Sequence, residues 1–140
     1  IVIQNTSNVA TNSDQGNDWF NYENSITTAN TNFQMDSCEL LFNGDIRLGD
    51  AVGEVKFFKY LQPMHHHTRV SMKNIYTYSF AMQPEDAQPT GAANFSRLRT
   101  SQLRLTYAPT DIGETRSIKI YATSLNVFQI HSGLGGLLFS

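Results

Sequence analysis

Short apolar segments alternate with long polar stretches along this 140-residue chain. The β-branched run Ile1–Ile3 is typical of part of a strand, and residues 38–43 (CELLFN) predict a second strand. This second strand leads into Asn43-Gly44, a pair that supplies the positive φ angles of a tight turn. Residues 5–32 are rich in Asn, Thr, Ser and Gly and show no period of 2 or 3.6, which predicts a long surface loop.

Three later segments also have strand character. Residues 74–82 (NIYTYSFAM) are aromatic and β-branched and predict the clearest strand of the chain. Apolar and polar residues alternate within residues 98–107, which predicts a strand with one solvent-facing side. The extended run 117–130 loses its alternation near Ser124, so we expect a bulge or a short turn to split it into two strands.

Residues 50–61 carry the one helical pattern. Apolar residues recur there every three positions, and Pro63 is expected to stop the helix; the apolar residues are Val52, Val55, Phe58 and Leu61. Many short strands with a single short helix predict an all-β fold, an antiparallel β-sandwich rather than a sheet of βαβ units, in one domain over residues 1–140.

The last segment, residues 132–139 (SGLGGLLF), is too apolar for a solvated tail, so we expect it to be buried against something. Its glycines resemble a phosphate-binding loop, but such a loop needs a following helix, and only four residues follow Gly136. Close packing of the backbone is the better interpretation of these glycines.

The composition of the chain disfavours several classes of function. Charged residues make up 16% of the chain, the net charge is −2, and no run of Lys or Arg is present, which disfavours direct nucleic-acid binding. No apolar run approaches the roughly 20 residues that span a bilayer, so membrane insertion is not expected. Cys38 is the only cysteine and is expected to be a buried, inert thiol. The chain begins with Ile1 rather than Met, and we interpret it as a piece of a longer protein.

The triplet His65-His66-His67 is the most conspicuous chemical feature. On a strand, imidazoles two residues apart share a face and could bind one metal ion. The carboxylate ligand that follows the His-x-His pair of cupin-type enzymes is missing, and His131 is remote in sequence. We therefore predict no metal or cofactor and a solvated or interface triplet, whose role the sequence leaves open.

No catalytic residues are predicted. Glu85 and Asp86 flank a proline turn and are interpreted as solvated, and no nucleophile with a base can be assembled from the sequence. Asn5 and Asn94 satisfy the Asn-x-Ser/Thr pattern, but the sequence does not decide whether either is glycosylated.

Two groups of side chains could mediate contacts. Trp19, Phe20 and Tyr22 are interpreted as an anchor that fastens the long loop to the body, with a sugar-stacking platform as the alternative. A mild basic cluster is expected to form surface or intersubunit pairs; it consists of Arg97, Arg99 and Arg104.

One string is specific to a family. Residues 80–91 read Phe-Ala-Met-Gln-Pro-Glu-Asp-Ala-Gln-Pro-Thr-Gly and residues 94–97 read Asn-Phe-Ser-Arg. This string resembles the signature of the major capsid proteins of nucleocytoplasmic large DNA viruses. Further segments resemble the family in the same order along the chain: 17–22, 41–44, 61–68, 121–122, 126–127 and 132–136.

The resemblance implies a structural role. Members of the family carry two successive jelly rolls, form trimers with a pseudo-hexagonal outline and tile an icosahedral shell. Residues 1–140 resemble the C-terminal jelly roll, with the first jelly roll and the opening strands of the second missing. The implied partners are copies of the chain in a homotrimer, neighbouring capsomers and minor capsid proteins. The implied location is the virion, after synthesis in the host cytoplasm.

Two other functions have specific requirements. A jelly-roll carbohydrate-binding module would need exposed, coplanar aromatic rings, and a cupin-like metalloenzyme would need a metal bound by His65 and His67. We also predict that Gly91→Val damages a turn that requires glycine and so impairs assembly.

Overall fold

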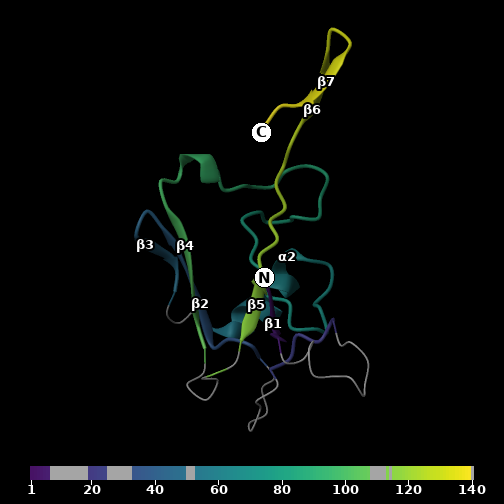
Figure 1. Ribbon diagram of the computed structural model, residues 1–140. Helices are drawn as coiled ribbons and strands as arrows, with labels where there is room; N and C mark the ends of the chain where they lie inside the picture. Colours follow the sequence, from purple (N-terminus) through teal and green to yellow (C-terminus); the bar gives the residue numbers. More distant parts are fainter. Residues whose placement is uncertain (7–18, 25–32, 50–52, 108–112, 114, 140) are drawn as a thin grey trace.

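The computed structural model describes residues 1–6, 19–24, 33–49, 53–107, 113 and 115–139 (Figure 1). Most of the loop predicted for residues 5–32 and the first residues of the helix predicted for residues 50–61 lie outside these ranges.

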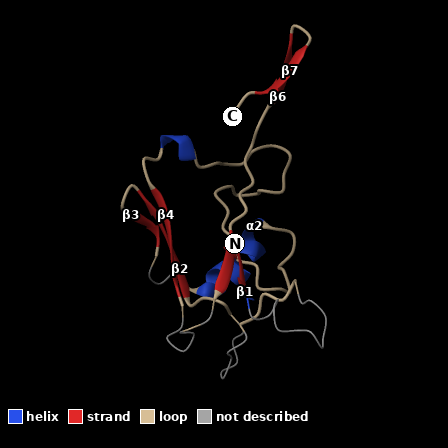
Figure 2. Cartoon of the chain, in the orientation of Figure 1, coloured by secondary structure: helices blue, strands red, loops and turns tan. Residues whose placement is uncertain are grey.

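Short strands dominate the described chain (Figure 2). In order, the elements are β1 (Val2–Asn5), β2 (Ser37–Phe42), β3 (Asp45–Leu48), the π-helical segment η2 (Phe57–Leu61), α2 (Gln62–His66), the 3₁₀ turn η3 (Phe95–Arg97), β4 (Ser101–Thr106), β5 (Arg116–Lys119), β6 (Phe128–His131) and β7 (Leu134–Leu137). All described strand pairs are antiparallel, which confirms the predicted all-β class.

The three-stranded sheet has the order β3-β2-β4. The β2–β3 turn carries Asn43 at φ 54° and Gly44 at φ 93°, as the Asn-Gly pair predicts. The Asn43 side-chain oxygen accepts hydrogen bonds from the N–H groups of Arg99 (3.0 Å) and Thr100 (3.2 Å), which fixes the entry into β4. On β4, Leu103 and Leu105 are half-buried, whereas Arg104 between them is exposed, so the predicted solvent-facing side is confirmed.

The run 117–130 does split, but by a longer interruption than predicted. Its first part lies in β5, which pairs with β1, and its last part forms β6, which pairs with β7. Residues 120–127 belong to neither strand, so the interruption is neither a bulge nor a short turn. In Figure 1 the β6–β7 hairpin projects away from the rest of the molecule.

The prediction that Pro63 ends the helix is wrong. Helical backbone continues through α2 to His66, with Pro63 in the first turn of α2. Proline has no N–H to give to a preceding turn, so a carbonyl there needs another partner. The Phe58 carbonyl accepts instead from the Thr77 N–H at 3.1 Å, an external hydrogen bond that the spacing of apolar residues could not reveal.

The regular strand predicted for residues 74–82 is also wrong. Only Ile75 forms a β-bridge, to Val2. The next backbone groups bond to Ile1, to the helix and to the Gln62 side chain rather than to a neighbouring strand. The β-propensity of these residues reflects how well their side chains fit half-buried, extended surroundings. A regular strand also requires a partner strand, and propensity does not predict one.

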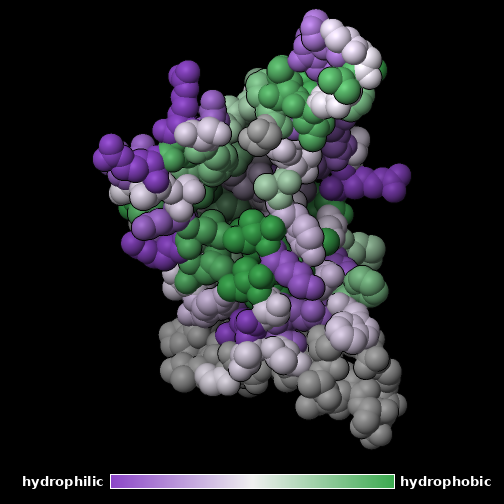
Figure 3. Space-filling model, turned by 45° about the horizontal axis from the view of Figure 1, so that its top comes forward, coloured by the Kyte–Doolittle hydropathy of each residue, from purple (hydrophilic) through white to green (hydrophobic). Residues whose placement is uncertain are grey.

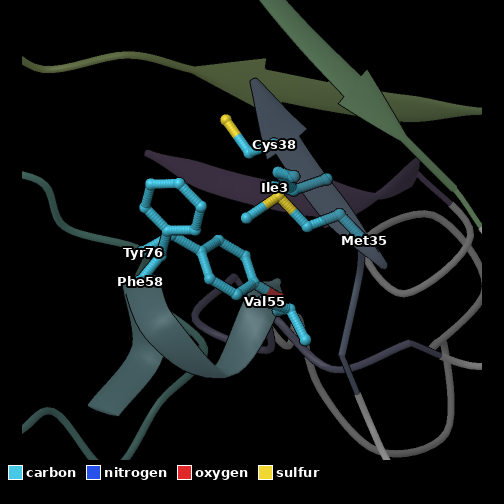
Figure 4. Close-up of a cluster of buried hydrophobic side chains, with 6 residues drawn as sticks. All are labelled: Ile3, Met35, Cys38, Val55, Phe58 and Tyr76. Carbon is cyan, nitrogen blue, oxygen red and sulfur yellow. The ribbon is translucent and has the colours of Figure 1, made fainter. Parts of the chain in front are cut away.

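The core lies between β1, β2, the helix and Tyr76 (Figure 4). Its buried side chains are Ile3, Met35, Cys38, Val55, Phe58 and Tyr76. The Tyr76 hydroxyl accepts a hydrogen bond from the Gln34 N–H at 2.9 Å, so the phenol is buried without losing its polar partner. Cys38 is buried as predicted, and this burial raises the pKa of its thiol to about 11, which keeps the thiol neutral and unreactive.

Aromatic rings extend this packing to the signature string. Phe80 stacks on Phe42 at a centroid distance of 6.2 Å, and Phe95 meets both rings edge-on at 5.6 Å. Tyr78 contacts Phe80 at 5.0 Å and Phe58 at 6.4 Å. The string thus joins the end of β2 to the core.

Candidate functional site

The histidine triplet lies at the end of a helix, not on a strand. His65 and His66 are the last residues of α2, and His67 follows in extended conformation. The expected two-residue spacing along a strand face, on which the metal alternative depended, is therefore absent.

Two histidines of the triplet take part in what we call the histidine–glutamate clip, which is made of His66, His67, Thr68, Met82 and Glu85. His67 Nδ1 donates to Glu85 Oε1 at 3.1 Å, and the Thr68 N–H donates to Glu85 Oε2 at 3.2 Å. The Thr68 hydroxyl donates to the same oxygen, and His66 Nδ1 donates to the Met82 carbonyl at 2.9 Å. These contacts tie the end of α2 to the turn that follows Met82.

Electrostatics favour the ionised form of the carboxylate in this clip. Hydrogen bonds from Thr68 and then His67 hold the pKa of Glu85 below its ordinary value. Glu85 was expected to be merely solvated; it is exposed, yet it is bound to Thr68 and His67 from 17 and 18 residues away in sequence. The residues next to Glu85 in sequence do not predict this pairing, because it depends on the loop that contains Glu85 lying against the end of α2.

The clip lines a shallow pocket of about 210 Å³. Its walls are His65, His66, His67, Thr68, Gln83, Glu85 and Asp86. Within the described ranges, no three His, Cys, Asp or Glu side chains are grouped so as to hold a metal ion. His131 lies on β6, in the hairpin that Figure 1 shows far from α2.

The glycine-rich segment 132–136 forms the tight turn and second strand of the β6–β7 hairpin. Ser132 (φ 52°) and Gly133 (φ 80°) make the turn, and a strand rather than a helix follows, so the segment has no phosphate-binding geometry. A Cβ on Gly135 would lie 2.8 Å from the Phe128 ring. The interpretation of close packing is confirmed at Gly135.

The aromatic anchor is wrong for Trp19 and Phe20, whose rings are exposed, whereas Tyr22 is half-buried. Trp19 is 56% exposed and Phe20 is 68% exposed, so neither ring is buried in the core. The backbone is held instead: Gln4 Nε2 donates to the Trp19 carbonyl at 2.9 Å, and Lys73 Nζ donates to the Phe20 carbonyl at 2.8 Å. Lys73 Nζ also lies 5.8 Å from the centroid of the Phe20 ring.

Three other candidates have definite surroundings. Arg104 pairs with Glu39 at 2.8 Å across β2 and β4, which confirms surface pairing for that member of the basic cluster. The Asn94 side chain caps η3 by accepting from the Ser96 N–H at 3.1 Å. Asn5 is fully buried in β1, so it is not accessible to glycosylation in this fold.

Many exposed apolar side chains lie on residues 118–139, which we call the C-terminal arm. Contrary to the expectation that the last segment is buried, the apolar side chains here are exposed: Ile118, Ile120, Tyr121, Leu125, Val127, Phe128, Ile130, Leu134, Leu137, Leu138 and Phe139. Figure 3 shows hydrophobic surface on the hairpin near the top of the view. Protein–protein contacts are one of the uses that large exposed apolar patches serve.

No helix in the described part of the chain is long and apolar enough to cross a bilayer.

Several known proteins with similar sequences are described as major capsid proteins. A family profile described as large eukaryotic DNA virus major capsid protein matches residues 2–136. The major capsid protein of Chrysochromulina ericina virus is 38% identical over 120 residues, which are 84% of this chain and 19% of that protein. The major capsid protein of Phaeocystis pouchetii virus is 41% identical over 104 residues, 73% of this chain and 20% of that protein. The chain thus spans about a fifth of the length of these curated relatives.

Solved structures agree in fold. PBCV-1 VP54, fitted into a reconstruction of the virophage Sputnik, is 25% identical with a TM-score of 0.59. The quasi-atomic PBCV-1 capsid gives 26% identity and a TM-score of 0.60. Each match covers 77% of this chain and 30% of the other.

Proposed function

The chain belongs to the family of major capsid proteins of large eukaryotic DNA viruses, and from this premise we propose that it is the C-terminal jelly-roll portion of a subunit that builds an icosahedral virus shell. The observation that carries the proposal is the family match over residues 2–136. The antiparallel fold is of the jelly-roll type found in the PBCV-1 capsid protein.

The physical properties of the chain suit assembly. A shell subunit works by fitting rigid surfaces against copies of itself, and closed symmetry repeats the same contact around each axis. The C-terminal arm offers the exposed apolar surface that such contacts bury. Family membership favours a structural protein over an enzyme and does not favour the carbohydrate-binding alternative.

Finer features of the role follow from the same premise. The subunit forms homotrimers of pseudo-hexagonal outline, which contact neighbouring capsomers and minor capsid proteins in the virion after synthesis in the host cytoplasm. The exposed apolar side chains of the arm and the low charge of the chain support contacts between proteins rather than with nucleic acid.

Electron microscopy of native particles tests the proposal. We expect pseudo-hexagonal capsomers, and peptides from residues 53–107 should be recovered by mass spectrometry from the purified shells in stoichiometric amounts. Full-length protein that stays monomeric and is absent from any particle would contradict the capsid role.

A further inference from the structure

We propose that the residues immediately before Ile1 in the full-length subunit continue strand β1 alongside residues 77–80 and complete that segment as a paired strand. The proposal rests on the proposed function in one respect, namely that this chain is part of a longer subunit. It assigns these preceding residues as the strand that pairs with residues 77–80.

The first observation is a reciprocal pair of hydrogen bonds. The Tyr76 N–H donates to the Ile1 carbonyl at 3.0 Å, and the Ile1 nitrogen donates to the Tyr76 carbonyl at 2.6 Å. Val2 and Ile75 form the adjacent antiparallel bridge. Two residues that exchange both bonds are a hydrogen-bonded pair of an antiparallel ladder. The ladder therefore already runs up to Ile1 in a defined register.

The second observation is the alternation of backbone groups beyond Tyr76. The Thr77 N–H donates to Phe58 and the Ser79 N–H donates to the Gln62 side chain at 3.2 Å, so both face the helix. In extended backbone the intervening residue faces the other way. The backbone N–H and C=O of Tyr78 therefore point to the same side as those of Tyr76. Neither group has a hydrogen bond to any residue that the structure describes.

The register then fixes the pairing. Because Ile1 lies opposite Tyr76, the residue before Ile1 lies opposite Thr77, and the residue before that can exchange two hydrogen bonds with Tyr78. An unpaired strand edge of this kind is a template for another strand.

The surroundings of the Ile1 nitrogen fit a continuing chain. Burial of this ammonium group lowers its pKa. A peptide N–H at the same place would donate the same ladder hydrogen bond to Tyr76 without the cost of desolvating a charge. A backbone amide therefore suits the position better than a charged terminus.

The same polypeptide is favoured over a second copy as the occupant. A covalent bond at Ile1 delivers the next residue to this edge in register, so that no bimolecular association is needed. The relatives are about five times longer than the aligned segment, so the family supplies the chain that would do this.

Cysteine cross-linking in the full-length protein tests the register. One variant combines Thr77→Cys with a cysteine at the position immediately before Ile1, a non-hydrogen-bonded pair whose side chains lie close on one face. The matched control combines Thr77→Cys with a cysteine one residue earlier, which projects from the opposite face. We expect an intrachain disulfide as the main oxidation product of the first variant and its loss in the control.

Each other outcome has a definite meaning. An interchain disulfide at the same pair would overturn the proposal in favour of a second copy, and no disulfide in a folded protein would overturn it altogether. Particle assembly of the reduced variant is scored separately by electron microscopy, so an intrachain disulfide without shells would reject the capsid role and leave the strand intact.

Hydrogen exchange of the unmodified full-length protein gives a second readout that needs no variant. The Tyr78 amide is expected to be protected to within about tenfold of the Tyr76 amide, since both would be ladder hydrogen bonds. Exchange of Tyr78 at the rate of an unfolded chain would refute the pairing.

Discussion

The core and the C-terminal arm are built from similar residues but have opposite surroundings. Around Tyr76, side chains from β1, β2 and the helix converge and exclude water (Figure 4). In the β6–β7 hairpin, Phe128, Ile130 and Leu134 are equally apolar but exposed. Two strands alone have one layer and cannot bury a face, whereas the core has a helix and a second sheet to close it. An apolar pattern therefore predicts that a strand is stabilised by packing against another element. It does not predict that this element belongs to the same chain.

The sharpest test of this comparison removes one phenyl ring from each region. Phe58→Ala leaves a cavity among Ile3, Val55 and Tyr76 and should lower the free energy of unfolding by about 3–5 kcal/mol. Phe128→Ala removes a ring that is 66% exposed and should change it by no more than about 0.5 kcal/mol. Urea unfolding of the 140-residue chain, followed by circular dichroism, measures both; equal losses would break the comparison.

Substitution of a glycine in the signature string should have the second largest effect. Gly91 has φ +147°, and a Cβ there would lie 3.1 Å from the Phe80 carbonyl oxygen. Gly91→Val should therefore lower the free energy of unfolding by about 1–3 kcal/mol and reduce the yield of shells.

The control for the unfolding measurement is Gly136→Val in the hairpin, where a Cβ meets nothing within 4 Å and φ is not positive. Particle yield is not compared for this variant, because Gly136 lies on the C-terminal arm. Unchanged thermal stability and particle yield for Gly91→Val would mean that the turn tolerates a side chain.

Polar substitution on the arm should separate folding from assembly. The double variant Ile130→Asp, Leu134→Asp should leave the unfolding free energy of the 140-residue chain within about 0.5 kcal/mol of the original, because both side chains are already solvated. The same change in the full-length protein should sharply lower particle yield, measured by sedimentation, because charge would enter a buried contact. Normal particles would show that the arm faces solvent in the shell.

The histidine–glutamate clip should give the smallest effect, and one that depends on pH. Because the pKa of Glu85 is lower in the folded chain, its contribution to stability is present above the ordinary carboxyl pKa and is lost as the pH falls through the lowered value. Glu85→Gln should therefore be slightly less stable than the original chain near neutral pH, and the difference should vanish in acid.

Thermal unfolding across roughly pH 3 to 7 measures this difference, with Asp86→Asn as the matched control from the same pocket. Replacing all three histidines by Gln should leave the fold intact, since the clip lies at the surface. A pH-independent loss for Glu85→Gln would show that the carboxylate acts through packing rather than through its charge.

Local chemistry explains why some elements were predictable. The strand β2, its Asn43-Gly44 turn and the one-sided burial of β4 depend on dihedral preference and on a period of two, both of which are written in adjacent residues. The signature string 80–91 was likewise readable, since the family match confirms what it resembles.

Elements that depend on distant partners were not predictable in the same way. Helical backbone passes Pro63 because Thr77 supplies the hydrogen bond that satisfies the Phe58 carbonyl. Glu85 is bound because the loop returns to Thr68 and His67. The residues next to Pro63 and Glu85 in sequence carry no pattern that predicts either contact.

The amino-acid order alone determined which segments favour extended backbone, where the tight turns lie and which family the chain resembles, because these depend on side chains within a few residues of one another. Tertiary structure alone decided whether residues 74–82 form a ladder, whether the apolar arm is covered and which carboxylate meets the histidines. Hydrogen bonds and burial need a partner in space, and the partner of a strand or a charge lies many residues away.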